Sequence, residues 1–172
     1  INRVGIFGHS GGGFMATAAI CTYPDFYKAA VSSSGNHDNN IYNRGWVEIY
    51  NGVQESTKTI QTATGKDSII YTFSSHVPTN MELAKNLKGH LLLVSGDQDR
   101  NVHPAHLLRM ANALIQANKN FEMLLIPGAK HGYTGQANRF FEKKLWFHFA
   151  KYLLGDFSSE QFTDLDETLK IK

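Results

Sequence analysis

The stretch that decides the fold covers residues 3–13 and reads Arg3-Val4-Gly5-Ile6-Phe7-Gly8-His9-Ser10-Gly11-Gly12-Gly13. Its first half is a short apolar run closed by a glycine, which is typical of a buried strand. The glycines lead directly into an apolar, alanine-rich stretch over residues 14–21, which predicts a helix that ends before Pro24. We therefore expect a strand, a tight turn and a helix in immediate succession, with Ser10 in the turn.

Three further apolar runs predict strands over residues 28–33, 90–95 and 121–126. Runs that are apolar on both faces are typical of parallel strands covered by helices. Apolar side chains recur at helical spacing over residues 104–118 and again over residues 140–154, and a short helix is expected over residues 81–87. The pattern predicts an α/β fold of about four parallel strands with flanking helices.

Two segments lack this regularity. Residues 36–65 are rich in Asn and aromatic side chains and are predicted to form a long loop, a place where function concentrates. Residues 156–172 are predicted to be a poorly anchored C-terminal tail after a domain over residues 1–155. Because the chain lacks an initiating Met and enters its first strand almost at once, we expect it to be part of a longer protein.

Composition excludes several classes of protein. The chain has 172 residues, of which 42% are hydrophobic and 19% charged, as in an ordinary globular domain. Seventeen basic and fifteen acidic residues give a net charge of +2 without a like-charged run, which argues against a nucleic-acid partner. No apolar run reaches the roughly 18 residues of a membrane helix. The single Cys21 cannot form an internal disulfide and reads as a packed thiol.

The turn itself carries the sharpest motif, Gly8-His9-Ser10-Gly11-Gly12, which has the pattern G-x-S-x-G. On a strand-to-helix turn this pattern projects a nucleophilic serine above the strand end, and small neighbours allow the close approach of strand and helix. The Gly11 N–H, at the helix N-terminus, is then placed to stabilise an oxyanion. A phosphate-binding loop is the rival interpretation, but its lysine and its glycine spacing are absent.

A serine nucleophile needs a base and a carboxylate that orients the base. The loop after the 90–95 strand holds Asp97 and Asp99, and the loop after the 121–126 strand holds His131. The chain order Ser, Asp, His is the one that this turn architecture requires. We favour Asp99 for the acid because it lies deeper in its loop, whereas Asp97 is placed to cap the turn.

A metal site is the second alternative at this end of the sheet. His103 and His106 are spaced i, i+3 and follow the two aspartates, but no H-E-x-x-H or cysteine spacing accompanies them. We therefore predict neither a metal nor another cofactor.

Three motifs of this chain resemble the catalytic domain of the prolyl oligopeptidase superfamily, and most closely its dipeptidyl-peptidase IV-like branch. These motifs are the elbow at residues 8–13, the loop Gly96-Asp97-Gln98-Asp99-Arg100-Asn101-Val102-His103 and the turn Lys130-His131-Gly132. The resemblance implies the C-terminal half of an α/β-hydrolase fold. It also implies a serine-type peptidase that releases an N-terminal dipeptide from a peptide substrate through an acyl-enzyme.

Residue by residue, the resemblance assigns Ser10 as nucleophile, Asp99 as orienter, His131 as base and the Gly11 N–H as oxyanion donor. It implies that Asn101 holds a substrate carbonyl and that Val102 lines the pocket for the substrate residue before the scissile bond. It suggests further pocket walls from the aromatic residues Tyr42, Trp46 and Tyr50.

The departures from the family pattern raise further expectations. The family's strands before the elbow, its second oxyanion donor and its N-terminal propeller have no counterpart here, so the first strand would keep an unpaired edge and favour self-association. A parent protein in the periplasm or outside the cell is implied by family analogy alone. A carboxylesterase on the same fold and a catalytically silent fragment are the alternative functions.

Overall fold

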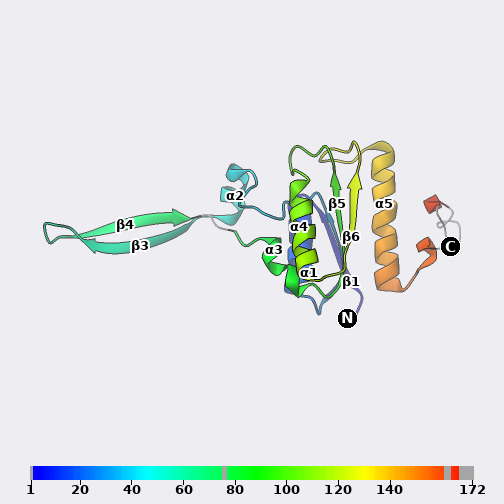
Figure 1. Cartoon of the computed structure of the whole chain (residues 1–172), viewed down its shortest axis with the longest axis horizontal. Coiled ribbons are helices and arrows are strands. Elements are labelled where there is room, and N and C mark those ends of the chain that lie inside the picture. Colours follow the sequence, from blue (N-terminus) through cyan, green and yellow to red (C-terminus); the bar gives the residue numbers. More distant parts are fainter. Residues whose placement is uncertain (1, 75–76, 161–163, 167–172) are drawn as a thin grey trace. The chain divides into compact units, whose positions relative to one another are not determined.

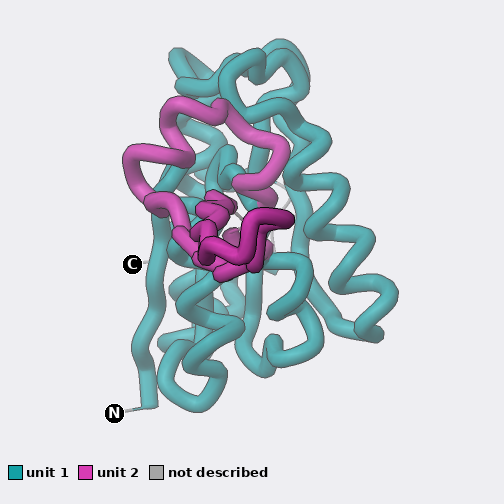
Figure 2. The backbone as a smooth tube through the Cα atoms, turned by 90° about the vertical axis from the view of Figure 1, so that its left-hand side faces the viewer, with its two compact units in different colours: residues 1–37, 80–172 teal, residues 38–79 magenta. Residues whose placement is uncertain are grey.

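The computed structural model describes residues 2–74, 77–160 and 164–166. The chain divides into two compact units, one formed by residues 1–37 and 80–172 and the other by residues 38–79 (Figure 2).

The first unit is built on a four-stranded parallel sheet with the strand order β1-β2-β5-β6. Its strands are β1 (Val4–His9), β2 (Tyr27–Ser33), β5 (His90–Gly96) and β6 (Glu122–Ile126). Its helical elements are α1 (Gly11–Thr22), α3 (Asn80–Leu83), η1 (Ala84–Asn86), α4 (Ala105–Gln116), α5 (Gly135–Phe149), η2 (Ala150–Leu154) and η3 (Ser158–Glu160). The predicted α/β fold with four parallel strands is confirmed.

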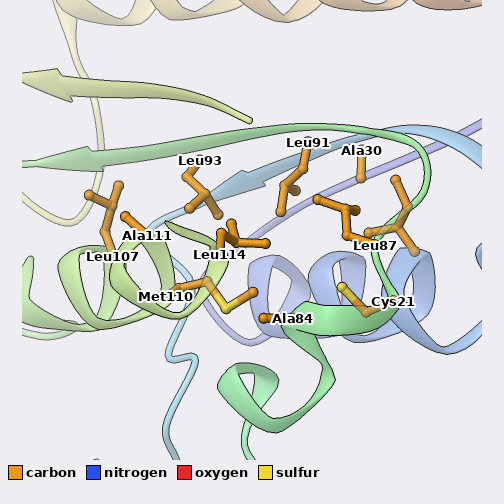
Figure 3. Packing of buried hydrophobic residues seen from close by; sticks show 11 residues of the cluster. Cys21, Ala30, Ala84, Leu87, Leu91, Leu93, Leu107, Met110, Ala111 and Leu114 are labelled. Atoms are coloured by element: carbon orange, nitrogen blue, oxygen red, sulfur yellow. The ribbon is translucent and has the colours of Figure 1, made fainter. Parts of the chain in front are cut away.

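Two apolar clusters cover the two faces of this sheet. Successive side chains of a strand point to opposite faces, so Leu91 and Leu93 of β5 pack in one cluster while Leu92 and Val94 pack in the other. The first cluster includes residues of α1 and α4, such as Cys21 and Leu114 (Figure 3). In the second, the sheet is packed against the aromatic and leucine side chains of α5. Figure 1 shows α1 and α4 on one side of the sheet and α5 on the other.

The topology brings three turns to one edge of the sheet. Because β1, β5 and β6 are parallel, their carboxyl ends lie at the same edge. Each strand is followed there by the turn or loop that leads to its helix, namely residue 10, residues 97–104 and residues 127–134. The candidate nucleophile, acid and base come from these three places.

The second unit holds the helix α2 (Arg44–Asn51) and an antiparallel hairpin of β3 (Gln54–Gln61) and β4 (Asp67–Ser74). The loop predicted for residues 36–65 is therefore wrong over residues 44–51 and 54–61. Every residue of β3 is exposed and most are polar, so the strand has no apolar alternation to reveal it. The available signals were the β-branched side chains of both strands and Gly65, whose φ of 73° suits the turn between them.

Strand β1 lies at an edge of its sheet and pairs with β2 alone among the described strands. Its Phe7 side chain is 65% exposed.

We expect this edge to support self-association, because unpaired N–H and C=O groups template pairing with a second chain. Light scattering should give more than the monomer mass for the chain and a lower mass for Phe7→Lys. A monodisperse monomer of the unaltered chain would contradict the prediction.

The helix α4 offers a matched pair of positions for testing the core. Leu114 is fully buried, whereas its neighbour Ile115 is 62% exposed. We expect Leu114→Ala to lower the free energy of unfolding by about 2–5 kcal/mol, because it leaves a cavity, and Ile115→Ala to change it by roughly 0.5 kcal/mol or less. Urea unfolding measures both values. Equal losses would show that the helix does not pack as described.

Candidate active site

Ser10 occupies a strained turn between β1 and α1. Its backbone has φ 59° and ψ −123°, a conformation that residues other than glycine rarely adopt. Two backbone hydrogen bonds hold it, since Ser10 N–H donates to the carbonyl of Ser33 (2.8 Å) and Phe14 N–H donates to the carbonyl of Ser10 (3.1 Å). The predicted strand-turn-helix unit is present at this position.

Two glycines allow the tight approach around this turn. A Cβ on Gly8 would lie 2.2 Å from the carbonyl oxygen of Gly12, and a Cβ on Gly13 would lie 2.6 Å from that of Ser33. Gly12, which the sequence grouped with them, has open space around it and is not required for packing.

The side chains of Ser10, His131 and Asp99 lie in one hydrogen-bonded row. The Nε2 atom of His131 is 3.0 Å from Ser10 Oγ, and its Nδ1 atom is 2.8 Å from Asp99 Oδ2. The Asp99 side chain is fully buried, and that of His131 is 25% exposed. A hydroxyl, an imidazole and a buried carboxylate in this order can transfer a proton from the hydroxyl to the ring.

The two aspartates of the loop after β5 have different partners. Asp99 Oδ1 accepts the backbone N–H groups of Asn101 and Val102, both at 2.9 Å, which leaves Oδ2 for His131. Asp97 Oδ1 instead accepts the N–H of Gly128 (2.6 Å), at the start of the loop that carries His131. The geometry thus pairs Asp99 with the imidazole and gives Asp97 a turn-holding contact.

The other predicted site residues of the first unit, Gly11, Asn101 and Val102, are close in sequence to Ser10 and Asp99. Gly11 is the first residue of α1, so its N–H has no acceptor within the helix and can face an anion. Asn101 is exposed, whereas the Val102 side chain is buried at 1% exposure. The structure places the backbone of both residues against Asp99, and their substrate contacts stay predictions.

Tyr42, Trp46 and Tyr50 belong to the second unit. The Tyr42 ring, which precedes α2, meets the Trp46 ring edge-on at a centroid distance of 5.5 Å, and the Trp46 ring is tilted against that of Tyr50 at 4.8 Å. Tyr50 is 68% exposed. Their predicted role as pocket walls stays a prediction.

The histidines of the rival metal site have separate surroundings. His106 is buried, while His103 is exposed and its Nδ1 accepts the N–H of Ala105 (3.1 Å). In the part of the chain that the structure describes, no three His, Cys, Asp or Glu side chains gather as metal ligands would.

The family model of the prolyl oligopeptidase family matches residues 1–157. The chain belongs to the prolyl oligopeptidase family. Its resemblance to the dipeptidyl-peptidase branch is also confirmed, as its relatives show.

Mouse dipeptidyl peptidase 8 is 28% identical over 131 residues, which are 76% of this chain and 14% of that protein. The crystal structure of Porphyromonas gingivalis dipeptidyl peptidase 4 matches with a TM-score of 0.68 and 27% identity over 86% of this chain and 19% of the other. A structure from Bacteroides ovatus ATCC 8483 matches with a TM-score of 0.73 and 25% identity, over 88% and 20% respectively. This chain therefore spans a fifth or less of the length of these relatives.

Among the described residues of this prolyl oligopeptidase family chain, no helix has the length and apolar character to cross a membrane.

A buried polar cluster behind the elbow was missed by the sequence reasoning. The Asn80 side-chain amide donates to His37 Nδ1 (3.0 Å) and to the carbonyl of Phe14 (2.9 Å), while Ser32 Oγ donates to the carbonyl of Gly13 (2.8 Å) and lies 3.5 Å from His37 Nε2. These bonds attach the first turn of α1 to the end of β2 and to the start of α3. The Asn-rich run at residues 36–40 is the available signal, but such a run is also typical of a loop.

His37 is a neutral imidazole within this cluster. Its side chain is 1% exposed, and burial, aided by the nearby His106, lowers its pKa from 6.5 to about 3. Because Ser32 gives its proton to Gly13, the proton of His37 belongs on Nε2, and Nδ1 accepts from Asn80.

We expect His37 to make the fold sensitive to acid. The unfolded chain binds a proton near pH 6.5, whereas folded His37 stays neutral to about pH 3, so the unfolded state gains stability as pH falls in this window. The free energy of unfolding should fall by up to about 1.4 kcal/mol per pH unit from this residue. Urea unfolding between about pH 6 and about pH 5 measures this slope.

The variant His37→Gln should lose that part of the slope, while His103→Gln, at an exposed position, should keep it. An unchanged slope in His37→Gln would contradict the assignment.

Proposed function

We propose that this chain carries the catalytic residues of a serine peptidase that hydrolyses peptide bonds near the N-terminus of its substrate. One observation supports this most strongly: Ser10 Oγ, both ring nitrogens of His131 and Asp99 Oδ2 lie in a continuous row with distances of 3.0 Å and 2.8 Å. Membership in the prolyl oligopeptidase family is consistent with it. Residues 1–155 would form the C-terminal part of an α/β-hydrolase peptidase domain, and residues 156–172 its tail.

In the proposed acylation step, Ser10 Oγ attacks the scissile carbonyl carbon while its proton moves to His131 Nε2. Asp99 holds the ring through Nδ1 and stabilises the imidazolium that forms. The Gly11 N–H, at the positive end of α1, donates to the oxyanion of the tetrahedral intermediate. His131 then returns the proton to the leaving amine, which departs and leaves the acyl group on Ser10.

Hydrolysis of the acyl-enzyme repeats this chemistry with water. His131 removes a proton from a water molecule, the hydroxide attacks the ester carbon, and the proton finally returns to Ser10 Oγ. We propose that Asn101 binds a substrate carbonyl and that Val102 lines the pocket for the residue before the scissile bond. For Tyr42, Trp46 and Tyr50 of the second unit we propose a role in substrate binding. The similarity to dipeptidyl peptidases supports the proposal of a dipeptide product.

The first test uses a fluorophosphonate probe on the full chain, with intact mass spectrometry to find the labelled residue. We expect labelling at Ser10 and none in Ser10→Ala. Asp99→Asn should slow labelling by about 10³-fold or more, because the ring loses its orienting partner and its correct tautomer. Asp97→Asn is the matched control in the same loop and should stay within about tenfold of the unaltered chain, since the asparagine side chain keeps an oxygen that can accept the Gly128 N–H.

The outcomes separate the proposals. Equal effects of the two aspartate changes would reject Asp99 as the partner of His131. A folded chain that is never labelled at Ser10 would reject the catalytic proposal for this chain. If labelling occurs, turnover of dipeptide amides and of small esters then distinguishes a peptidase from an esterase.

A further inference from the structure

His9, the residue before Ser10, lies against the loop that carries His131. The centroids of the His9 and His131 rings are 4.8 Å apart, with the ring planes inclined by 52°. His9 also meets the ring of Tyr133 edge-on at 5.9 Å. The variable position of the G-x-S-x-G motif is therefore in contact with the candidate base and with the second residue after it.

A chain of hydrogen bonds links the same residues. His9 Nδ1 is 3.0 Å from Ser33 Oγ, Ser33 Oγ donates to the hydroxyl of Tyr133 (3.0 Å), and that hydroxyl is 3.2 Å from Ser34 Oγ. A serine hydroxyl has one proton, and Ser33 gives it to Tyr133, so Ser33 can only accept from His9. The network thus assigns a proton to His9 Nδ1, whereas between Tyr133 and Ser34 either hydroxyl can be the donor.

Ser33 is the centre of this arrangement. Its backbone carbonyl accepts the N–H of Ser10 (2.8 Å), and its side chain contacts both His9 and Tyr133. Ser33 is 1% exposed, so its polar atoms depend on these partners. Tyr133 is fixed from its other side by the ring of Phe141 in α5, at 5.1 Å. The turn of Ser10 and the loop of His131 are therefore held by the same residue of β2.

The charge state of His9 matters for its neighbour. Partial burial and the proximity of His131 lower the pKa of His9, against the opposing effects of Asp99 and of a hydrogen bond to the His131 backbone. His9 therefore stays neutral at neutral pH. A second cation beside His131 would oppose the proton that His131 must take from Ser10, whereas a neutral imidazole does not.

We propose that His9 is a positioning residue for His131, acting as a neutral imidazole that donates from Nδ1 to Ser33 and packs against the His131 ring. The inference rests on the proposed role of His131 as base. In this proposal His9, the residue before the nucleophile in the G-x-S-x-G motif, helps to place the base. Tyr133 connects His9 and Ser33 to the loop that carries His131.

The test needs a readout that does not depend on activity. Nuclear magnetic resonance of the full chain, with isotope-labelled histidine, reports the tautomer of His9 and the exchange with water of the His131 Nδ1 proton that faces Asp99. We expect a neutral His9 with its proton on Nδ1 and a slowly exchanging His131 proton. In His9→Phe, which keeps a ring but has no donor, the His131 proton should exchange faster.

Labelling of Ser10 by the fluorophosphonate probe provides the second readout. His9→Phe should label about tenfold to a hundredfold more slowly, because a misplaced base loses its alignment. His9→Gln, which keeps an N–H donor, should recover part of the rate. His90→Phe is the control, since His90 stacks on Tyr152 at the start of β5 and contacts none of the residues of the proposed chain.

The two proposals fail in different ways. If the unaltered chain is not labelled, the proposed function fails, while the resonance data still decide the role of His9. A cationic His9 at neutral pH, or a His9→Phe variant whose His131 proton exchanges as slowly as in the unaltered chain, would overturn the inference. Circular dichroism of each variant confirms that the compared chains are folded.

Discussion

The strained backbone of Ser10 is the constraint on which the rest of the site depends. A residue held in this region of φ and ψ costs on the order of 1–3 kcal/mol, so its surroundings must keep it there. The bond from Ser10 N–H to the Ser33 carbonyl and the close approach that Gly8 and Gly13 allow do so. Because β1 passes into α1 without a loop, the strain also fixes the direction of Oγ and the position of the first helical N–H groups.

The acid and the base reach this serine because side chains order their loops. Asp99 uses one oxygen to hold its own backbone and the other to hold His131, and Asp97 connects its loop to the start of the next. A buried carboxylate without such partners would be costly, and here the carboxylate of Asp99 accepts two backbone N–H groups and faces Nδ1 of His131. The loops that hold the candidate acid and base are therefore fixed by hydrogen bonds to carboxylate oxygens.

The sequence reveals the parts of this fold that depend on apolar periodicity and little of what depends on polar burial. The four parallel strands, α1 and α4 follow from apolar runs, and Ser10, Asp99 and His131 from the turns after them. The β3–β4 hairpin could not be predicted in the same way, because its strands are exposed and bury no apolar face. The burial of His37 and Asn80 is not predicted, because polar residues in a sequence are typical of a loop. Only the structure shows their buried partners, such as the carbonyl of Phe14.

The end of β2 explains why one strand can organise both sides of the site. Consecutive side chains of a strand point to opposite faces. Ser32 accordingly reaches Gly13 of the nucleophile helix, while Ser33 reaches His9 and Tyr133 beside the base. The Ser33 carbonyl accepts the N–H of Ser10 itself. The end of β2 therefore contacts the turn of Ser10 through Ser32 and the Ser33 carbonyl, and it contacts the loop of the candidate base through the Ser33 hydroxyl and Tyr133. One strand end thus holds the two candidate groups in a common frame.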